Sequence, residues 1–283
     1  MQPFTLDIGG EIRRYARTQI MGILNVTTDS FYSGSHNASD AEVCRRVERM
    51  AAEGADFIDV GGYSSRPGAS EVPEDEELRR VRAGVLAARR LAPRIPVSVD
   101  TFRASVARRA VEEWGAHMVN DISGGALDPD MFRTVASLRV PYVLMHMRGT
   151  PATMQTLTGY ADVTADVIAE LRRPLLRLAQ EGVRDVVVDP GFGFAKTLEQ
   201  NYDLFRHIPD MIRILERPLL VGVSRKSMIT RLCGIGADEA LPGTVALGTA
   251  AVMAGAAFLR VHDVGAAVQA LKVTLPLTGG SWQ

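Results

Sequence analysis

Cysteine is scarce in this chain, whose 283 residues include only Cys44 and Cys233. Two cysteines so far apart fit neither a metal-ligand spacing nor a disulfide framework. We therefore expect two reduced thiols and a cytoplasmic protein, because that compartment keeps thiols reduced. The N-terminus also lacks the apolar stretch of a signal peptide, since Asp7, Glu11 and Arg13 interrupt it.

An excess of charge of either sign is missing as well. The formal net charge is −1, so the chain has no global basic field to attract nucleic acid or an anionic membrane. The longest apolar run, Val245–Leu259, contains two glycines and a threonine and is short for a membrane span. The composition thus predicts a protein without a nucleic-acid or membrane partner.

What the chain does contain is a repeated alternation of short apolar strands with helical patterns. With 46% hydrophobic residues it can bury a sizeable core, and its length is normal for one α/β barrel. The expected strands are Ile20–Val26, Phe57–Val60, Pro96–Asp100, His117–Asp121, Tyr142–His146, Val186–Asp189, Pro218–Val223 and Phe258–Val261. Eight such strands predict a (β/α)8 barrel. A doubly wound open sheet is the alternative, but no glycine-rich dinucleotide fingerprint follows the first strand.

The barrel is expected to span residues 20–275. Residues 1–19 form a separate N-terminal segment, with a hairpin around Gly9 and Gly10 covering one end of the barrel, and residues 276–283 form a tail. Helical spacing is expected between the strands, including one helix over residues 198–213.

Polar residues end most of these strands. The β-branched run Val186–Val188 reads as a buried strand that ends on Asp189, and a buried carboxylate is costly unless it is paired. One such residue is explained by a turn or a helix cap, but the pattern recurs at Asn25, Asp59, Asp100, Asn120, His146, Lys226 and the Arg260–His262 pair. Ligands of these barrels meet the C-terminal ends of the strands, so the pattern predicts a site there.

The polar strand ends divide into two chemistries. Four of them offer acceptors, an amide and a cation suited to a flat heterocycle, namely Asp100, Asn120, Asp189 and Lys226. Asn25, Arg260 and His262 suit phosphate oxygens and a hydrated divalent ion. Two structural alternatives stay open: a buried polar network at the barrel mouth, and a rim ion pair of Arg260 with Asp263 or Asp59.

Several segments, in order, resemble the motif set of the dihydropteroate synthase family. The matching segments run from about Met21 to Val264 and read MGILNVTTDSF, GADFIDVGGYSSRPGA, VSVDT, MVNDISGG, LMHMRGTPATMQ, VVVDPGFGFAKTLEQN, VGVSRKSMI and RVHDV. The resemblance implies a TIM-barrel enzyme of folate synthesis. It would join 6-hydroxymethyl-7,8-dihydropterin diphosphate to 4-aminobenzoate, use Mg²⁺ and form a homodimer through late helices.

The resemblance also assigns roles to individual residues. The implied pterin-binding residues are Asp100, Asn120, Met145, Asp189, Phe194 and Lys226. The implied diphosphate-binding residues are Asn25, Ser65, Arg260 and His262, with Asn25 as the metal ligand. The implied aminobenzoate-binding residues are Phe31, Arg66, Pro67 and Ser227. The implied catalytic residues are Asp100, Asp189, Lys226, Arg260 and His262.

The chain departs from the family pattern in two loops. Thr28, Ser33 and Ser35 replace a proline, an aspartate and a glycine in the first loop, and Tyr63 replaces a glutamate in the second. We expect these changes to weaken the capture of aminobenzoate and to leave the pterin residues in place. Two other functions remain as hypotheses: a pterin-dependent methyltransferase domain, which needs no diphosphate site, and a pterin-binding paralogue without turnover.

Overall fold

The computed structural model describes residues 1–26, 36–63 and 71–280. Within them, eight parallel strands form one sheet whose order is β8-β7-β6-β5-β4-β3-β10-β9. The strands are β3 (Gln19–Asn25), β4 (Phe57–Gly61), β5 (Val97–Asp100), β6 (Met118–Asp121), β7 (Tyr142–Met145), β8 (Val186–Asp189), β9 (Leu220–Val221) and β10 (Phe258–Val261). A parallel bridge between Val188 and Leu219 joins the two ends of this order, so the sheet closes into the predicted (β/α)8 barrel.

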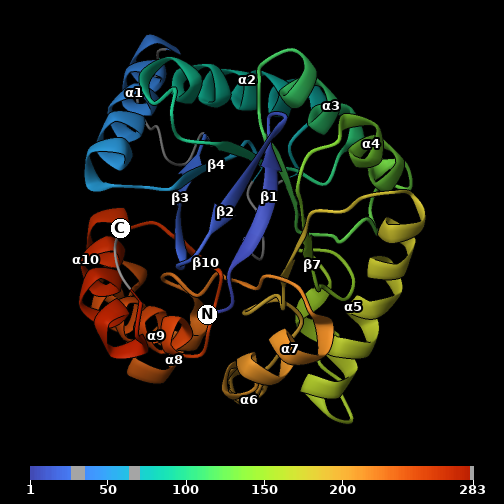
Figure 1. The fold of residues 1–283 in the computed structure, drawn as a ribbon, viewed down its shortest axis with the longest axis vertical. Helices are drawn as coiled ribbons and strands as arrows, with labels where there is room; N and C mark the ends of the chain where they lie inside the picture. The colour runs from blue at the N-terminus through green and yellow to red at the C-terminus, as the bar shows by residue number, and fades with distance from the viewer. Residues whose placement is uncertain (27–35, 64–70, 281–283) are drawn as a thin grey trace.

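Helices surround the barrel, as Figure 1 shows in a view down its short axis. They are α1 (His36–Glu53), α2 (Glu74–Leu91), α3 (Ala104–Glu112), α4 (Met131–Leu138), α5 (Val163–Gln180), α6 (Leu198–Arg206), α7 (Ile208–Leu215), α8 (Ser227–Cys233), α9 (Leu241–Met253) and α10 (Val264–Thr274). Short 3₁₀ turns lie at Met154–Thr156, Ala237–Glu239 and Leu275–Thr278. The strands are buried because the helices cover their outer faces and side chains fill the interior.

The single helix expected over residues 198–213 is two helices. Thr197 and Gln200 form a capping box at the start of α6, and the chain then leaves helical geometry at His207. Pro209 lies in the first turn of α7. A proline inside a continuous helix would remove a backbone donor and clash with the preceding turn, whereas the first turn tolerates it.

The N-terminal hairpin closes one end of the barrel. Strands β1 (Phe4–Ile8) and β2 (Glu11–Tyr15) pair antiparallel around Gly9 and Gly10, which both have positive φ. Leu6 and Ile8 pack on residues that begin or line the barrel strands: Met21, Phe57, Met118, Val143, Val187, Leu220, Ala257 and Phe258. In Figure 1 the hairpin crosses the centre of the ring of helices. The N-terminal ends of the strands are therefore sealed by apolar side chains.

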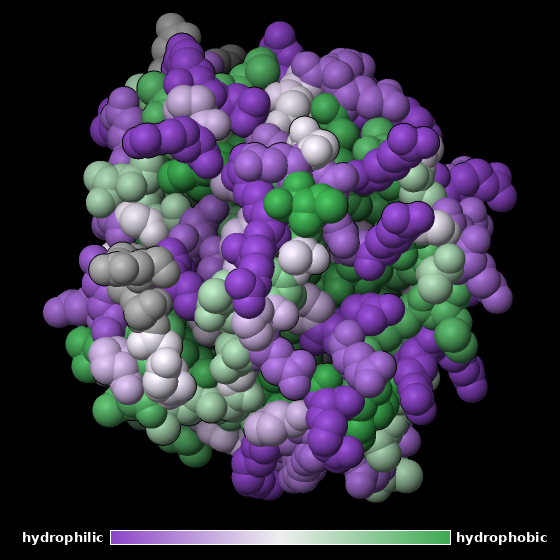
Figure 2. Space-filling model, viewed as in Figure 1, coloured by the Kyte–Doolittle hydropathy of each residue, from purple (hydrophilic) through white to green (hydrophobic). Residues whose placement is uncertain are grey.

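The outer surface at the hairpin end is mostly hydrophilic. Figure 2 shows charged and polar side chains over much of this face, with apolar groups between them. Among residues 1–26, 36–63 and 71–280, every helix is too short or too polar to cross a membrane. This end of the molecule thus offers a cap for the core, and the polar strand ends lie at the opposite end.

Candidate active site

The register of the parallel sheet aligns the polar strand ends. Asn25 pairs with Gly61, Gly61 with Asp100, and Asp100 with Asn120, across four neighbouring strands. Residues in register on parallel strands point to the same face, so these side chains gather inside the barrel mouth. Gly61 leaves room between its neighbours, because an added Cβ would lie 3.5 Å from Asn25 Oδ1 and 3.6 Å from Asp100 Cβ.

Arg260 connects two of these carboxylates. Its Nε donates to Asp59 Oδ2 at 2.7 Å, and its Nη2 donates to Asp100 Oδ2 at 2.6 Å. Asn120 Nδ2 also donates to Asp59 Oδ2, at 2.9 Å. Asp59 Oδ1 is buried without a hydrogen-bond partner among the residues described. The ion pair with Asp59, one of the alternatives from the sequence, is present, and Asp263 instead pairs with Arg225.

The carboxyl group of Asp100 lies in a strongly perturbing environment. Burial raises its pKa to about 7; the Arg260 guanidinium opposes this shift and the Asp59 carboxylate adds to it. Burial alone would also lower the pKa of Arg260, but Asp59 and Asp100 together raise it above its usual value. The guanidinium thus stays charged, while Asp100 titrates near neutral pH.

Asp189 and Lys226 form the second part of the site. Asp189 Oδ1 accepts a hydrogen bond from Gly191 N at 2.8 Å. Lys226 Nζ donates to Phe192 O at 2.5 Å and lies 4.5 Å from the centroid of the Phe194 ring. Burial raises the pKa of Asp189, against the lowering effect of the Lys226 charge, and lowers the pKa of Lys226 to about 8. The Asp189 carboxylate and the Lys226 ammonium are near enough for each to shift the pKa of the other, so this part of the site contains both an acceptor and a donor.

An apolar wall adjoins these polar groups. Met145 and Phe194 are buried in one cluster with Ile122, Met154 and Ala195. Phe102, at the side of this cluster, makes an edge-on contact with Tyr63, with ring centroids 5.2 Å apart. The site therefore combines a flat apolar surface with hydrogen-bonding groups at its edge, as ligand pockets usually do.

Tyr63, which replaces the glutamate of the family pattern, makes contacts through its aromatic ring. The guanidinium of Arg103 lies 4.9 Å from the Phe102 ring centroid and 5.8 Å from that of Tyr63. Buried Glu77 forms an ion pair with Arg103 from the other side. A glutamate at position 63 could pair directly with such a cation, whereas Tyr63 contacts it through the face of its ring.

His262 directly follows strand β10, the eighth strand of the barrel, and Ser227 begins helix α8. Ser224 Oγ is 3.0 Å from His262 Nδ1 and also accepts from His262 N at 3.2 Å, which fixes the imidazole. Ser227 is the first residue of α8 and is exposed.

Several further predicted residues lie outside the described part of the chain: Phe31, Ser65, Arg66 and Pro67, together with Thr28, Ser33 and Ser35 of the divergent first loop.

Sequence reasoning missed the contacts that support the site. Asp59 had been counted among the polar strand ends and as a rim partner of Arg260, and the structure shows that it anchors both Arg260 and Asn120. Buried Lys196 and His146 contact each other, and His146 also contacts Glu170, so His146 supports the loops of the site. The signal was available for Lys196, since it closes the Gly-Phe-Gly-Phe loop that follows Asp189.

The oxygens present suit a metal bound mainly through a substrate. Among the described residues, no group of three or more His, Cys, Asp or Glu side chains could hold a metal ion. Mg²⁺ usually keeps several waters and binds through one or two protein oxygens plus phosphates. The Asn25 amide oxygen, directed into the barrel mouth beside Asp100, fits that mode of binding.

Comparisons with known proteins agree with this geometry. The family model "Pterin binding enzyme" matches residues 21–262. A dihydropteroate synthase of Synechocystis sp. is 43% identical over 260 residues, covering 91% of this chain and 89% of that protein. The structure of Xanthomonas albilineans dihydropteroate synthase with 4-aminobenzoic acid is 39% identical, with a TM-score of 0.89 and coverage of 98% and 99%.

A second structure of the Xanthomonas albilineans enzyme, in complex with 7,8-dihydropteroate, is 38% identical with a TM-score of 0.85 and covers 97% of this chain and 98% of that one. These matches are to synthases that span nearly the same length, and they favour the synthase over the methyltransferase hypothesis. The chain belongs to the dihydropteroate synthase family of pterin-binding enzymes.

Proposed function

We propose that this chain catalyses the reaction of its family. It joins 6-hydroxymethyl-7,8-dihydropterin diphosphate to 4-aminobenzoate and releases 7,8-dihydropteroate and diphosphate. The observation that carries the proposal is the cluster of Asp100, Asn120, Asp189 and Lys226 at one barrel mouth, beside the apolar wall of Met145 and Phe194. Relatives with the same fold have been crystallised with 4-aminobenzoic acid and with 7,8-dihydropteroate.

The pterin ring binds against that wall. The carboxylates of Asp189 and Asp100 accept from its amino and ring N–H groups, and Asn120 and Lys226 donate to its ring nitrogens and carbonyl. Each buried hydrogen bond to a charged partner is worth about 1.5–3 kcal/mol. The two carboxylates, with raised pKa values, are ionised most readily when such donors are present.

The diphosphate binds at the ends of β3 and β10, which are the first and eighth strands of the barrel. Its contacts there are Asn25, Ser65, Arg260 and His262. Arg260 already holds Asp59 and Asp100, so it has three tasks: it binds the leaving group, orients Asp100 and offsets the buried carboxylates. Asn25 would hold Mg²⁺ together with the diphosphate, and the bound ion would further neutralise the leaving group.

The chemistry follows an SN1-like path. The bond between the pterin methylene and the diphosphate oxygen breaks, and its electron pair leaves with the diphosphate. The electron-rich dihydropterin spreads the positive charge, which Asp189 and Asp100 stabilise. The amino nitrogen of aminobenzoate then bonds to the methylene and loses a proton to water. Positioning and electrostatics carry the catalysis, and no covalent enzyme intermediate is required.

Aminobenzoate binds at the outer side of the mouth. Its contacts are Phe31, Arg66, Pro67 and Ser227, by the family resemblance. Ser227, exposed at the start of α8, supplies a hydroxyl donor for the carboxylate.

We also propose a cytoplasmic homodimer that pairs through the late helices, where Met253 and Val273 are exposed apolar residues. Sedimentation of the purified chain tests the dimer.

Product formation tests the proposed function. The purified chain is incubated with the pterin diphosphate and 4-aminobenzoate, with and without Mg²⁺, and dihydropteroate is measured by chromatography. We expect product, and much less of it after removal of Mg²⁺. Binding of a pterin analogue without any product would instead favour a paralogue without turnover.

A further inference from the structure

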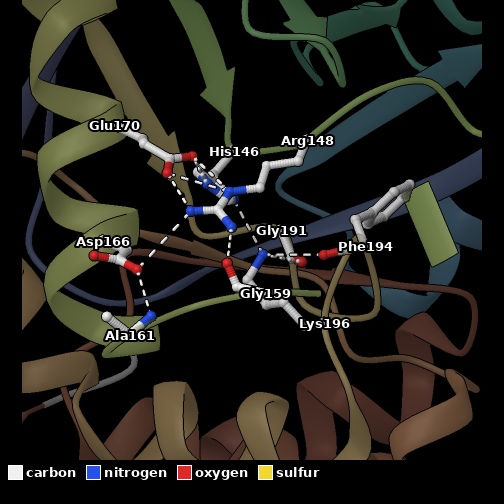
Figure 3. Close-up of polar contacts among 9 residues, drawn as sticks. All are labelled: His146, Arg148, Gly159, Ala161, Asp166, Glu170, Gly191, Phe194 and Lys196. Atoms are coloured by element: carbon white, nitrogen blue, oxygen red, sulfur yellow. Dashed lines mark hydrogen bonds and ion pairs between the residues drawn. The ribbon is translucent and has the colours of Figure 1, made fainter. Parts of the chain in front are cut away.

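Lys196 is a buried cation just behind the proposed pterin pocket. It is 6% exposed, and its Nζ lies 3.1 Å from each of three acceptor atoms: Gly191 O, Phe194 O and His146 Nδ1. Figure 3 shows the ammonium between the loop that follows β8 and the imidazole of His146. A buried ammonium is costly unless all its hydrogens are bonded, and here three partners surround it.

The protons of this group can be assigned from its neighbours. His146 Nε2 is 2.9 Å from Glu170 Oε2, and a carboxylate only accepts, so Nε2 carries the imidazole proton. His146 Nδ1 is then an acceptor, and Lys196 must donate to it. Lys196 therefore donates three hydrogen bonds, and three donors require the charged ammonium form.

The contacts that run from Lys196 through His146 to Glu170 end at Arg148. Arg148 forms an ion pair with Glu170, donates to Gly159 O at 2.6 Å and lies 3.7 Å from the Tyr160 ring centroid. Figure 3 shows Arg148 beside Glu170 of helix α5, and His146 between Glu170 and Lys196. The buried cation is thus tied, through neutral His146, to a helix outside the barrel.

The loop that Lys196 holds is a tight one. Gly191 and Gly193 have φ values of 71° and 82°, and Ala195 has a φ of 48°, which is unusual for a residue with a side chain. A Cβ on Gly191 would come within 2.0 Å of His146 O, so the loop backbone lies directly against the end of β7. Backbone of this kind persists only where its surroundings fix it.

Two lysines bind successive carbonyl groups of this loop. Lys196 binds the carbonyls of Gly191 and Phe194, while Lys226 binds the carbonyl of Phe192 between them. The same loop carries the amide that bonds Asp189 and the ring of Phe194 that lines the pocket.

We propose that Lys196 is a positioning residue for pterin binding, because its bonds to Gly191 O and Phe194 O hold the Asp189–Phe194 loop in the shape that places Asp189 and the Phe194 ring against the pterin. The inference rests on the proposed function, since it takes Asp189 and Phe194 as pterin contacts. Lys196 itself lies behind the pocket wall and acts through the loop.

The charge of Lys196 gives this role a pH dependence. Burial lowers its pKa to about 7; Asp189 and Glu170 raise it, and Lys226 and Arg148 lower it further. Burial likewise lowers the pKa of His146, which keeps the imidazole neutral. As the pH rises through 7, Lys196 loses a proton and one of its three donated bonds, so the loop loses an anchor.

The test compares Lys196→Met with Arg17→Met. Arg17 forms a half-buried ion pair with Asp56 at the opposite end of the barrel, at 2.8 Å, so each variant loses one cation that has hydrogen-bond partners, at opposite ends of the barrel. We expect the Kd of a pterin analogue to rise by tenfold or more in Lys196→Met and to stay within about twofold of wild type in Arg17→Met. Hydrogen exchange at Gly191–Phe194 should quicken only in the first variant.

A second pair of variants, at His146, tests the proposal even if Lys196→Met does not fold. His146→Asn keeps an acceptor oxygen near the position of Nδ1, whereas His146→Leu removes it. We expect His146→Asn to retain more pterin affinity than His146→Leu. Equal pterin affinity in wild type and Lys196→Met, or equal loss in both His146 variants, overturns the proposal. A wild-type chain that binds no pterin analogue would instead contradict the proposed function, whatever the loop exchange shows.

Discussion

The two ends of the barrel are built from the same eight strands and differ in almost every other respect. At the N-terminal ends, Leu6 and Ile8 of the hairpin seal an apolar cluster. At the C-terminal ends, Arg260 links two carboxylates, and Asp189 and Lys226 lie close together. The first arrangement buries apolar surface and stabilises the fold. The second desolvates charges and holds acceptors and donors ready for a ligand, at a cost in stability.

Strand β8 contains the contrast within a few residues. Asp185, just before the strand, accepts from Asp7 N of the hairpin at 2.6 Å. Asp189, its last residue, faces the proposed pterin pocket beside Lys226. Two aspartates at the two ends of this strand thus lie in different surroundings: Asp185 bonds the hairpin, and Asp189 lies at the mouth where we propose that the ligand binds.

The largest expected effect comes from Arg260→Met. Asp59 and Asp100 would both lose the guanidinium that pairs with them, and breaking a buried ion pair typically costs about 3–5 kcal/mol. We expect that loss in urea unfolding, together with loss of turnover. Arg17→Met at the opposite end should lose stability and keep kcat/KM. Arg260→Met with wild-type stability would show that the two carboxylates do not depend on it.

Leu6→Ala should break the other end of the comparison. The side chain is buried under the barrel, and truncation of a buried leucine costs about 2–5 kcal/mol. We expect a lower free energy of unfolding with unchanged kcat/KM in the folded protein. Ile12→Ala on the same hairpin is the control, because Ile12 is 77% exposed and should contribute within about 0.5 kcal/mol. A fall in kcat/KM with Leu6→Ala would give the sealed end a part in function.

Asp189→Asn and Asp185→Asn sharpen the comparison on a single strand. Loss of a charged acceptor costs about 1.5–3 kcal/mol, which is roughly a 10- to 150-fold weaker Kd for a pterin analogue. Calorimetry should find that loss for Asp189→Asn and wild-type affinity for Asp185→Asn. Equal affinities would remove Asp189 from the site.

The smallest effect expected is a pH dependence of pterin affinity. In the proposed complex Asp100 accepts from the pterin as a carboxylate, and burial raises its pKa to about 7. Below that pH the group is protonated and must release its proton to bind, so affinity falls by up to about tenfold per pH unit. Titrations between pH 5.5 and 6.5, where Lys196 keeps its charge, should therefore show tighter binding at the higher pH, and Asp100→Asn should flatten the slope.

The sequence predicted what depends on local pattern. The β-branched run of Val186–Asp189 and the segment Phe258–Val261 are strands with those bounds. The seventh strand of the barrel was expected over Pro218–Val223, but β9 comprises only Leu220–Val221. The sequence cannot mark this boundary, because apolar residues beside a strand resemble those within it whether or not their backbones form ladder hydrogen bonds. Parallel strands in a barrel present their ends at one rim, which sufficed to predict a site there.

Contacts across the barrel could be predicted only in part. Arg260 and Asp59 are 201 residues apart, and the sequence left Asp59 and Asp263 open as partners, because the choice depends on register and side-chain direction, which no local pattern specifies. Lys196 follows the Gly-Phe-Gly-Phe loop in the sequence, but its contact with His146 of another strand end could not be read from that position. The residues proposed to contact the pterin could be named from the sequence, and most of the contacts that hold them in place could not.

A crystal structure with a bound pterin analogue tests the central claim, that the polar end alone binds the substrate, most directly. We predict the ring between Met145 and Phe194, within hydrogen-bond distance of the carboxylate of Asp189 and the amide of Asn120. A pterin bound at the hairpin end, or outside the barrel mouth and away from Asp189, would contradict the account.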